Sequence, residues 1–264
     1  SPLLMDDLML LSRPVSYISY KVSANDNASH KVQVYFGASS NVAVNVPSQA
    51  VTTSKYTSGK LSILKAGTVE QPILKKKGDD LRIDWGYMYV AAPSAAHPVQ
   101  YVSAPGDAMQ AFVKGGAATT KLNKDVVLST AVDLGTVNST PKEQLFLLGY
   151  DDLYALQYFG ANLKAWWKND GTQTIEKQLN AAFTDYAAIL EKCTRFNEQL
   201  HRDAVSAGGE TYAKLCELAY RQSIAAHKLA KSPQGDILFL SKENFSNGCI
   251  NTVDVTYPSA PLFL

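Results

Sequence analysis

Val15-Ser16-Tyr17-Ile18-Ser19-Tyr20-Lys21-Val22 is the stretch that decides the fold class of the first half of the chain. Its β-branched and aromatic side chains alternate loosely with polar ones, which is typical of a β-strand. The turn cluster Asn25-Asp26-Asn27 follows, and Lys31-Val32-Gln33-Val34-Tyr35-Phe36 has the pattern of a second strand. We therefore predict that these two strands form a hairpin.

Short runs of the same kind continue to about residue 140, separated by Asn, Asp, Gly, Ser and Pro. Many short strands with regular turn signals favour an antiparallel β-sandwich. We interpret the aromatic run Trp85-Gly86-Tyr87-Met88-Tyr89-Val90 as sandwich core or interdomain contact rather than as a sugar-binding surface. The further predicted strands cover residues 43–46, 51–56, 60–65, 81–89, 99–103, 111–114 and 125–134.

The pattern changes to a helical period after about residue 145. Apolar residues recur at steps of three and four within residues 150–168, and again within residues 175–206. Gly208-Gly209 ends the second predicted helix, and residues 211–231 are predicted to form a third.

The fold class predicted from these patterns is mixed, with β and α in separate modules. An antiparallel β-sandwich is expected over residues 1–145 and a helical domain over residues 146–264. Asp151 and Asp152 fall just before the first predicted helix, where a carboxylate commonly caps backbone N–H groups. Residues 237–240 are predicted to form a short buried strand.

Composition excludes several classes of protein. Hydrophobic residues make up 46% of the 264 residues, so the chain is expected to fold around a core, and the net charge of +1 argues against a nucleic-acid partner. No apolar run approaches the roughly 20 residues of a membrane-spanning helix. The chain has three cysteines but no Cys-x-x-Cys pair, and its four histidines are scattered along the sequence. We therefore predict no metal site.

The last residues of the chain are unusually apolar. The sequence closes with Tyr257-Pro258-Ser259-Ala260-Pro261-Leu262-Phe263-Leu264 and has no polar tail. Chain ends are usually polar and exposed, so we expect that a helix follows in the parent protein and that the helical domain is incomplete here.

Four blocks of sequence carry a resemblance to a known family. They are Ser1-Pro2-Leu3-Leu4 with the strand pair through Lys31-Val32-Gln33-Val34-Tyr35-Phe36, Leu148-Gly149-Tyr150-Asp151-Asp152 through Trp166-Trp167, Glu217-Leu218-Ala219-Tyr220-Arg221-Gln222-Ser223-Ile224-Ala225-Ala226-His227-Lys228, and Ser241-Lys242-Glu243-Asn244-Phe245-Ser246-Asn247-Gly248 through Val253-Asp254-Val255-Thr256-Tyr257-Pro258-Ser259-Ala260-Pro261. These blocks resemble the glutaminase A family and span nearly the whole chain.

The resemblance implies an antiparallel β-sandwich followed by an incomplete (α/α)6 toroid of the six-hairpin glycosidase type. It also implies a secreted or periplasmic protein that hydrolyses L-glutamine to L-glutamate and ammonia. Because one fold hosts many activities, a glycoside hydrolase of the six-hairpin type stays an alternative. A non-catalytic carbohydrate-binding or structural module is a third interpretation. The expected partner is a small-molecule substrate, either glutamine or a glycan, while the oligomeric state stays open.

Glu243 and Asp254 are the candidate catalytic residues, because they lie in the polar, helix-poor end of the chain. Two carboxyl groups facing one cavity can act as general acid and general base on an amide, or on a glycoside when they are about 6.5–9.5 Å apart. Asn244 and Tyr257 flank them and are the candidate substrate-binding residues. No cofactor is required by this chemistry.

Cys249 and His227 carry side chains of types that can act in hydrolysis. Cys249 has no histidine near it in sequence that would stabilise a thiolate, so a nucleophilic role is disfavoured. His227 lies on a predicted helix, and we interpret it as a hydrogen-bonded packing residue rather than as a base.

Overall fold

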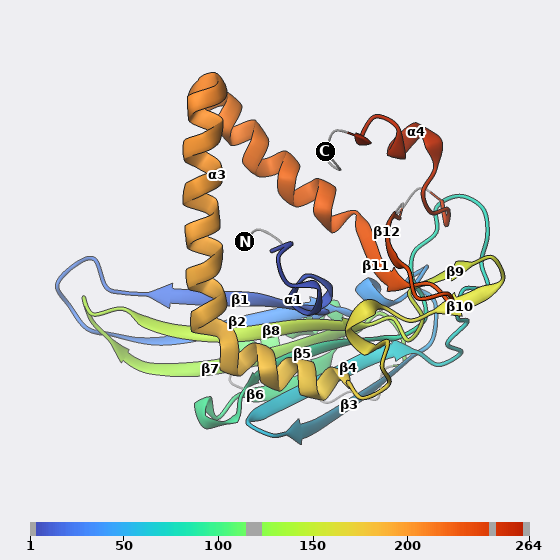
Figure 1. Ribbon diagram of the computed structural model, residues 1–264. Coiled ribbons are helices and arrows are strands. Elements are labelled where there is room, and N and C mark those ends of the chain that lie inside the picture. Colours follow the sequence, from blue (N-terminus) through green and yellow to red (C-terminus); the bar gives the residue numbers. More distant parts are fainter. Residues whose placement is uncertain (1–3, 115–122, 243–246, 261–264) are drawn as a thin grey trace.

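The computed structural model describes residues 4–114, 123–242 and 247–260 (Figure 1). Its strands form two larger antiparallel sheets and two short two-stranded ribbons. Most helical residues belong to one long element, α3 (Ile175–Ala225). The predicted combination of antiparallel sheets with helices is therefore confirmed.

The larger sheet has five strands in the order β1-β8-β5-β4-β3, and every neighbouring pair is antiparallel. Its members are β1 (Val15–Val22), β3 (Val51–Ser58), β4 (Leu61–Thr68), β5 (Tyr87–Pro93) and β8 (Lys142–Asp151). β4 and β5 are buried along almost their whole length. Such continuous burial is typical of central strands that are covered on both faces.

The smaller sheet has three strands in the order β2-β7-β6. They are β2 (His30–Ser39), β6 (Val99–Ser103) and β7 (Val127–Val137), again antiparallel. The register of β2 on β7 shifts between Val32 and Gln33, as in a β-bulge.

Alternate side chains of the five-stranded sheet point into two different cores, since successive residues of a strand face opposite sides. Ile63 of β4 packs in a cluster with Leu179 of α3. Its neighbour Leu64 packs in another cluster with Leu128 of β7. The five-stranded sheet therefore lies between the smaller sheet and α3.

The predicted hairpin of the first two strands is wrong. β1 pairs with β8 and β2 pairs with β7, so residues 23–29 carry the chain from one sheet to the other. Pairing with β8 and β7 lets each strand place its apolar side chains in a core shared by the two sheets, as Ile18 and Val34 do.

Three of the other predicted strands take different forms. In the predicted strand 43–46, Ala43 ends the short helix η1 (Ser40–Ala43) and residues 44–46 follow it. Residues 111–114 lie at the end of α2 (Pro105–Val113), which starts with a proline at its first turn. Only 87–89 of the predicted strand at 81–89 belong to β5. The strands predicted at 51–56, 60–65, 99–103 and 125–134 are confirmed by β3, β4, β6 and β7.

The helix predicted for residues 150–168 is also wrong. This segment contains the end of β8, the ribbon of β9 (Leu156–Tyr158) and β10 (Ala161–Leu163), and the short helix η3 (Trp166–Lys168). Phe159 and Gly160 connect the ribbon with φ values of 44° and 85°. Two successive residues with positive φ form a tight hairpin turn, and they interrupt any helix.

α3 confirms the helix predicted at 175–206, including its start. The side chain of Thr174 caps the helix by accepting a hydrogen bond from the N–H of Lys177. Gly209 has φ 79° and ψ −178°, a non-helical conformation, and here the helix turns back on itself (Figure 1). α3 is therefore a helical hairpin, and its first limb runs along the sheet before it bends away towards this turn (Figure 1).

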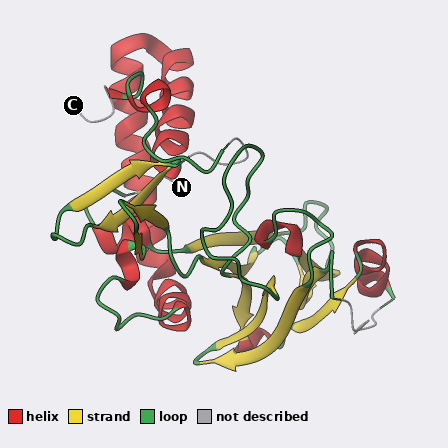
Figure 2. Cartoon of the chain, turned by 90° about the vertical axis from the view of Figure 1, so that its right-hand side faces the viewer, coloured by secondary structure: helices red, strands yellow, loops and turns green. Residues whose placement is uncertain are grey.

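The third predicted helix, at 211–231, is correct only up to Ala225. Beyond it β11 (His227–Lys231) pairs with β12 (Ile237–Ser241), which confirms the short strand predicted at 237–240. Figure 2 shows α3 and this ribbon on one side of the chain and the larger sheets on the other. Strand β8 includes residues 145 and 146, so the five-stranded sheet continues through the module boundary that the sequence predicts between these residues.

Gly86 and Gly160 offer a matched test of how tightly the sheet packs on the turn after β8. Their φ values are 81° and 85°, so a side chain is strained equally at both positions. A Cβ at Gly86 would lie 2.1 Å from the carbonyl oxygen of Asp151, whereas nothing lies within 4 Å at Gly160. We expect Gly86→Ala to lower the free energy of unfolding by about 2 kcal/mol or more beyond Gly160→Ala, measured by urea denaturation. Equal losses would contradict this packing.

Candidate functional site

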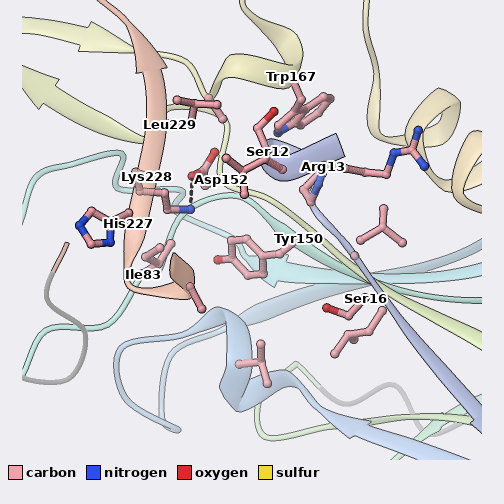
Figure 3. Close-up of a pocket in the computed structure, with 18 of the residues that line it drawn as sticks. Ser12, Arg13, Ser16, Ile83, Tyr150, Asp152, Trp167, His227, Lys228 and Leu229 are labelled. Atoms are coloured by element: carbon pink, nitrogen blue, oxygen red, sulfur yellow. Dashed lines mark hydrogen bonds and ion pairs between the residues drawn. The ribbon is translucent and has the colours of Figure 1, made fainter. Parts of the chain in front are cut away.

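A pocket of about 650 Å³ lies where α1 (Leu8–Ser12), the end of β8 and β11 meet (Figure 3). This volume is in the range of roughly 300–1,000 Å³ that is usual for small-molecule sites. Its polar lining includes Ser12, Tyr150, Asp152, His227 and Lys228.

The central pair of the pocket comes from two distant parts of the chain. Asp152 follows directly after β8, and only 3% of it is exposed. Lys228 lies on β11, 76 residues later, and its Nζ is 3.1 Å from Oδ2 of Asp152 (Figure 3). The start of β11 just after α3 therefore places a cation opposite the end of β8.

Two more lysines surround this pair. Lys168, which ends η3 and is buried, forms an ion pair with Asp151. Lys242 is 9% exposed, and its Nζ donates a hydrogen bond of 2.6 Å to the carbonyl oxygen of Ala155. The charges of Lys168 and Lys242 both act on Asp152.

The protonation of Asp152 follows from these charges. Burial alone would raise its pKa, because burial disfavours the charged carboxylate. The three lysines outweigh burial, Lys228 most of all, and hold the pKa of Asp152 below the ordinary aspartate value. Asp152 is therefore a carboxylate at neutral pH.

Lys242 is shifted toward the neutral amine. Burial is the main cause that lowers its pKa to about 8, and the nearby charge of Lys228 lowers it further, while Asp152 opposes both. A lysine with this pKa changes its charge close to physiological pH, whereas an ordinary lysine titrates near 10.4.

Aromatic side chains form a further part of the wall, beside aliphatic residues and the charged Arg13 and Arg82. The hydroxyl of Tyr150 donates a hydrogen bond of 2.7 Å to the carbonyl oxygen of Trp85. Burial and the charge of Asp152 raise the pKa of Tyr150, so it stays a neutral donor. Trp167 lines the pocket but is only 2% exposed.

His227 acts through hydrogen bonding and packing. Its Nδ1 lies 2.6 Å from the carbonyl oxygen of Ser223, and because a carbonyl only accepts, Nδ1 carries the proton. The ring stacks on Phe239 with centroids 4.5 Å apart. Both contacts agree with the sequence-based interpretation.

Of the four sequence-predicted site residues, the two that the structure describes lie elsewhere. Asp254 is in the first turn of α4 (Val253–Thr256) and is exposed, and Tyr257, which follows α4, is 79% exposed. Neither lines the pocket. Glu243 and Asn244 lie outside the described residues. The catalytic and substrate-binding roles given to these four residues stay predictions.

The buried charges were missed in the sequence. The prediction that Asp151 and Asp152 cap a helix is wrong, because no helix starts directly after them. Asp151 accepts a hydrogen bond from the N–H of Leu153 and pairs with Lys168, and Asp152 pairs with Lys228. The available signal was a lysine directly after an apolar run, as in Trp166-Trp167-Lys168. A cation in such a place needs a buried counter-ion.

Two kinds of feature are not found in the described part of the chain. Within residues 4–114, 123–242 and 247–260, no three His, Cys, Asp or Glu side chains are grouped so that they could hold a metal ion. In the same ranges no helix is both long enough and apolar enough to cross a membrane.

The chain combines antiparallel sheets with a helical hairpin, and a charged pocket lies where α1, β8 and β11 meet. Comparison with known families shows which family it belongs to. Residues 1–203 match the family model of a domain of unknown function (DUF5127). Residues 209–264 match the glutaminase A six helical-hairpin domain. The chain belongs to the glutaminase A family.

Two curated relatives agree with this assignment. The chain is 29% identical over 278 aligned residues to "Glutaminase A" of Aspergillus oryzae, a match that covers 100% of this chain and 40% of that protein. It is 26% identical over 204 residues to a "Probable glutaminase" of Arthroderma benhamiae, covering 69% of this chain and 23% of that protein. The chain thus spans less than half the length of either relative.

The buried pair gives a prediction about stability. Asp152→Asn removes the buried carboxylate that pairs with Lys228, so we expect a loss of about 3 kcal/mol in the free energy of unfolding at pH 7. The control is Glu191→Gln, which removes an exposed ion pair with Arg195 and should cost at most about 0.5 kcal/mol.

The difference in stability between wild type and Asp152→Asn should depend on pH. Because folding lowers the pKa of Asp152, its contribution is present above the unfolded-state pKa and is lost as pH falls through the folded-state pKa. The difference between wild type and Asp152→Asn should therefore shrink in acid, as measured by denaturant titration at several pH values. A constant difference would contradict the charged state of Asp152.

Proposed function

We propose that the protein containing this chain is a glutaminase that hydrolyses L-glutamine to L-glutamate and ammonia. The observation that carries the proposal is the similarity of the whole chain to a protein named Glutaminase A. Because the chain spans 40% of that relative, we attribute the reaction to the protein that contains the chain and not to these residues alone.

The proposed architecture is a β-sandwich followed by the first part of an (α/α)6 toroid. The two cores on opposite faces of the five-stranded sheet support the sandwich. The helical hairpin of α3 and the match of residues 209–264 to a six helical-hairpin domain support the toroid.

The pocket supports a small charged substrate better than a glycan. Sugar sites present the exposed faces of aromatic rings, whereas Trp167 is 2% exposed. The charged pair Asp152 and Lys228 lies in the wall instead. Glutamine has an α-carboxylate and an α-ammonium group, and a wall with both signs of charge complements such a zwitterion.

We propose that the chemical step takes place outside this pocket, with Glu243 and Asp254 as the acid and base and Asn244 and Tyr257 binding the substrate there. One carboxylate takes a proton from water as its oxygen attacks the side-chain amide carbon. The other, protonated, gives its proton to the nitrogen as the C–N bond breaks. Water and glutamine become glutamate and ammonia, and no cofactor takes part.

We also propose that the protein is secreted or periplasmic. This proposal is supported only by the resemblance to a family of such proteins. Fractionation of cells that produce the protein, followed by immunoblotting, would test it, and recovery in the cytoplasm alone would contradict it.

The proposed reaction is tested by measuring ammonia release from L-glutamine. The assay uses the full-length natural protein that contains this chain. We expect Glu243→Gln and Asp254→Asn each to lower kcat by at least about 100-fold, because each removes a proton-transfer group. The control Glu198→Gln changes an exposed residue of α3 and should leave kcat unchanged.

A parallel assay of sugar release from a panel of glycosides separates the rival activities. Sugar release without ammonia release would replace the glutaminase proposal with a glycoside hydrolase. Absence of both would favour a binding or structural module.

A further inference from the structure

We infer that one loop end of the two larger sheets, formed by residues 23–29 and 138–141, is a modification site that carries N-linked oligosaccharides on Asn27 and Asn138. This goes beyond the proposed reaction. It rests on the proposed export of the protein, and of the two compartments named there it takes secretion.

Both asparagines stand in the acceptor motif for this modification, which is Asn-x-Ser or Asn-x-Thr with any residue except proline in the middle. The motifs are Asn27-Ala28-Ser29 and Asn138-Ser139-Thr140. A third tripeptide of this type, Asn244-Phe245-Ser246, lies outside the described residues, and we make no inference for it. Because the sugar chain is bulky and solvated, the folded protein has to present the modified asparagine at its surface.

The first motif lies in an exposed turn between β1 and β2, in which every residue from 25 to 29 is exposed. Asn27 has a φ of 58°, a left-handed conformation that asparagine tolerates better than most residues. The carboxylate of Asp26 holds the turn, since it accepts a hydrogen bond of 3.1 Å from the N–H of Ala28 and lies 3.0 Å from Nε2 of His30. These contacts do not use the amide of Asn27, so a sugar on its Nδ2 leaves them intact.

The second motif lies in the exposed loop between β7 and β8. Oδ1 of Asn138 accepts a hydrogen bond of 2.8 Å from the backbone N–H of Thr140, which forms an Asx-turn. Because Oδ1 is directed at the backbone, Nδ2 of the same planar amide is directed away from this contact. Asn138, Ser139 and Thr140 are all exposed, so the turn presents the acceptor nitrogen to solvent.

The two loops meet at the end of the sheets that is farthest from the pocket. The N–H of Ala24 donates a hydrogen bond of 2.8 Å to the carbonyl oxygen of Asn138. Figure 1 shows these loops at the left, and α1 and β11, which line the pocket, to their right. β8 has 10 residues and runs from the loop to the pocket, which separates the two by roughly 30 Å at about 3.3 Å per residue. Oligosaccharides here leave the pocket open and keep this end in solvent, so no other domain or subunit covers it.

The modification is a group transfer from an oligosaccharide that is linked to a lipid diphosphate. Nδ2 of the asparagine attacks the anomeric carbon, and the new C–N bond forms as the C–O bond to the diphosphate breaks. The lipid diphosphate leaves, and a base of the transferring enzyme takes the proton from the amide. The motif requires a hydroxyl at its third position, which Ser29 and Thr140 supply.

The test uses the full-length protein recovered from the cells that naturally produce it and from their medium. It is treated with peptide N-glycosidase in heavy-oxygen water, which converts each glycosylated asparagine to a labelled aspartate, and its tryptic peptides are analysed by mass spectrometry. We expect labelled aspartate at positions 27 and 138. The occupancy at Asn138 should be the lower of the two, because Pro141 restricts the backbone of Thr140. An unlabelled peptide at either position overturns the assignment of that position, whether or not the protein leaves the cell.

Variants produced in the same cells test whether the motif directs the modification. Asn27→Gln and Asn138→Gln should each remove one step of the shift that the glycosidase causes in gel mobility. Ser29→Ala and Thr140→Ala should do the same although both asparagines remain. Thr140→Ala also keeps the backbone N–H of the Asx-turn, so its effect reports on the hydroxyl and not on the turn.

Asn25→Gln is the matched control, because Asn25 is exposed in the same turn but stands outside the motif. It should leave the mobility shift unchanged. A labelled aspartate at position 27 in Ser29→Ala would overturn the role of the motif.

Ammonia release measured on the same preparation separates this inference from the proposed reaction. Labelled positions 27 and 138 in a protein that releases no ammonia leave the inference standing and overturn the glutaminase proposal. Ammonia release by a protein that is unlabelled at both positions does the reverse.

Discussion

A carboxylate that is almost fully buried has to be neutralised by the protein, and Asp152 imposes this constraint on the architecture. Its partners come from three places: η3, β11 and the residue that follows β12. Each of these segments has to approach the end of β8 for the charge to be compensated. Removing one partner of such a cluster costs several kcal/mol, so the arrangement is strongly specified.

The five-stranded sheet provides the frame on which this cluster forms. It is apolar on both faces, and α3 covers the face opposite to the smaller sheet. Because α3 starts on that face and turns back at Gly209, its second limb delivers β11 to the same edge where β8 ends. Packing of the first limb and the turn of the helix thus determine where Lys228 lies.

Local patterns predict individual strands and helices better than they predict which strands pair. The strands at 51–56 and 99–103 and the start of α3 follow from alternation, spacing and a helix cap, which are short-range features. Strand β8, which pairs with β1, and Lys228, which pairs with Asp152, lie more than 70 residues away from these partners, and the local pattern around β1 and Asp152 does not predict either pairing. The helix predicted at 150–168 failed because apolar spacing alone does not reveal a turn such as Phe159-Gly160.

The strand orders have a consequence for synthesis of the chain. In each larger sheet the strand that comes last in sequence lies between earlier ones: β8 between β1 and β5, and β7 between β2 and β6. As the chain leaves the ribosome, the earlier strands therefore expose unpaired edges until residues 127–151 emerge, and such edges invite association with other chains. Residues 127–151 then complete both sheets in one continuous stretch, so the open strand edges of the nascent protein are covered within the synthesis of this short segment.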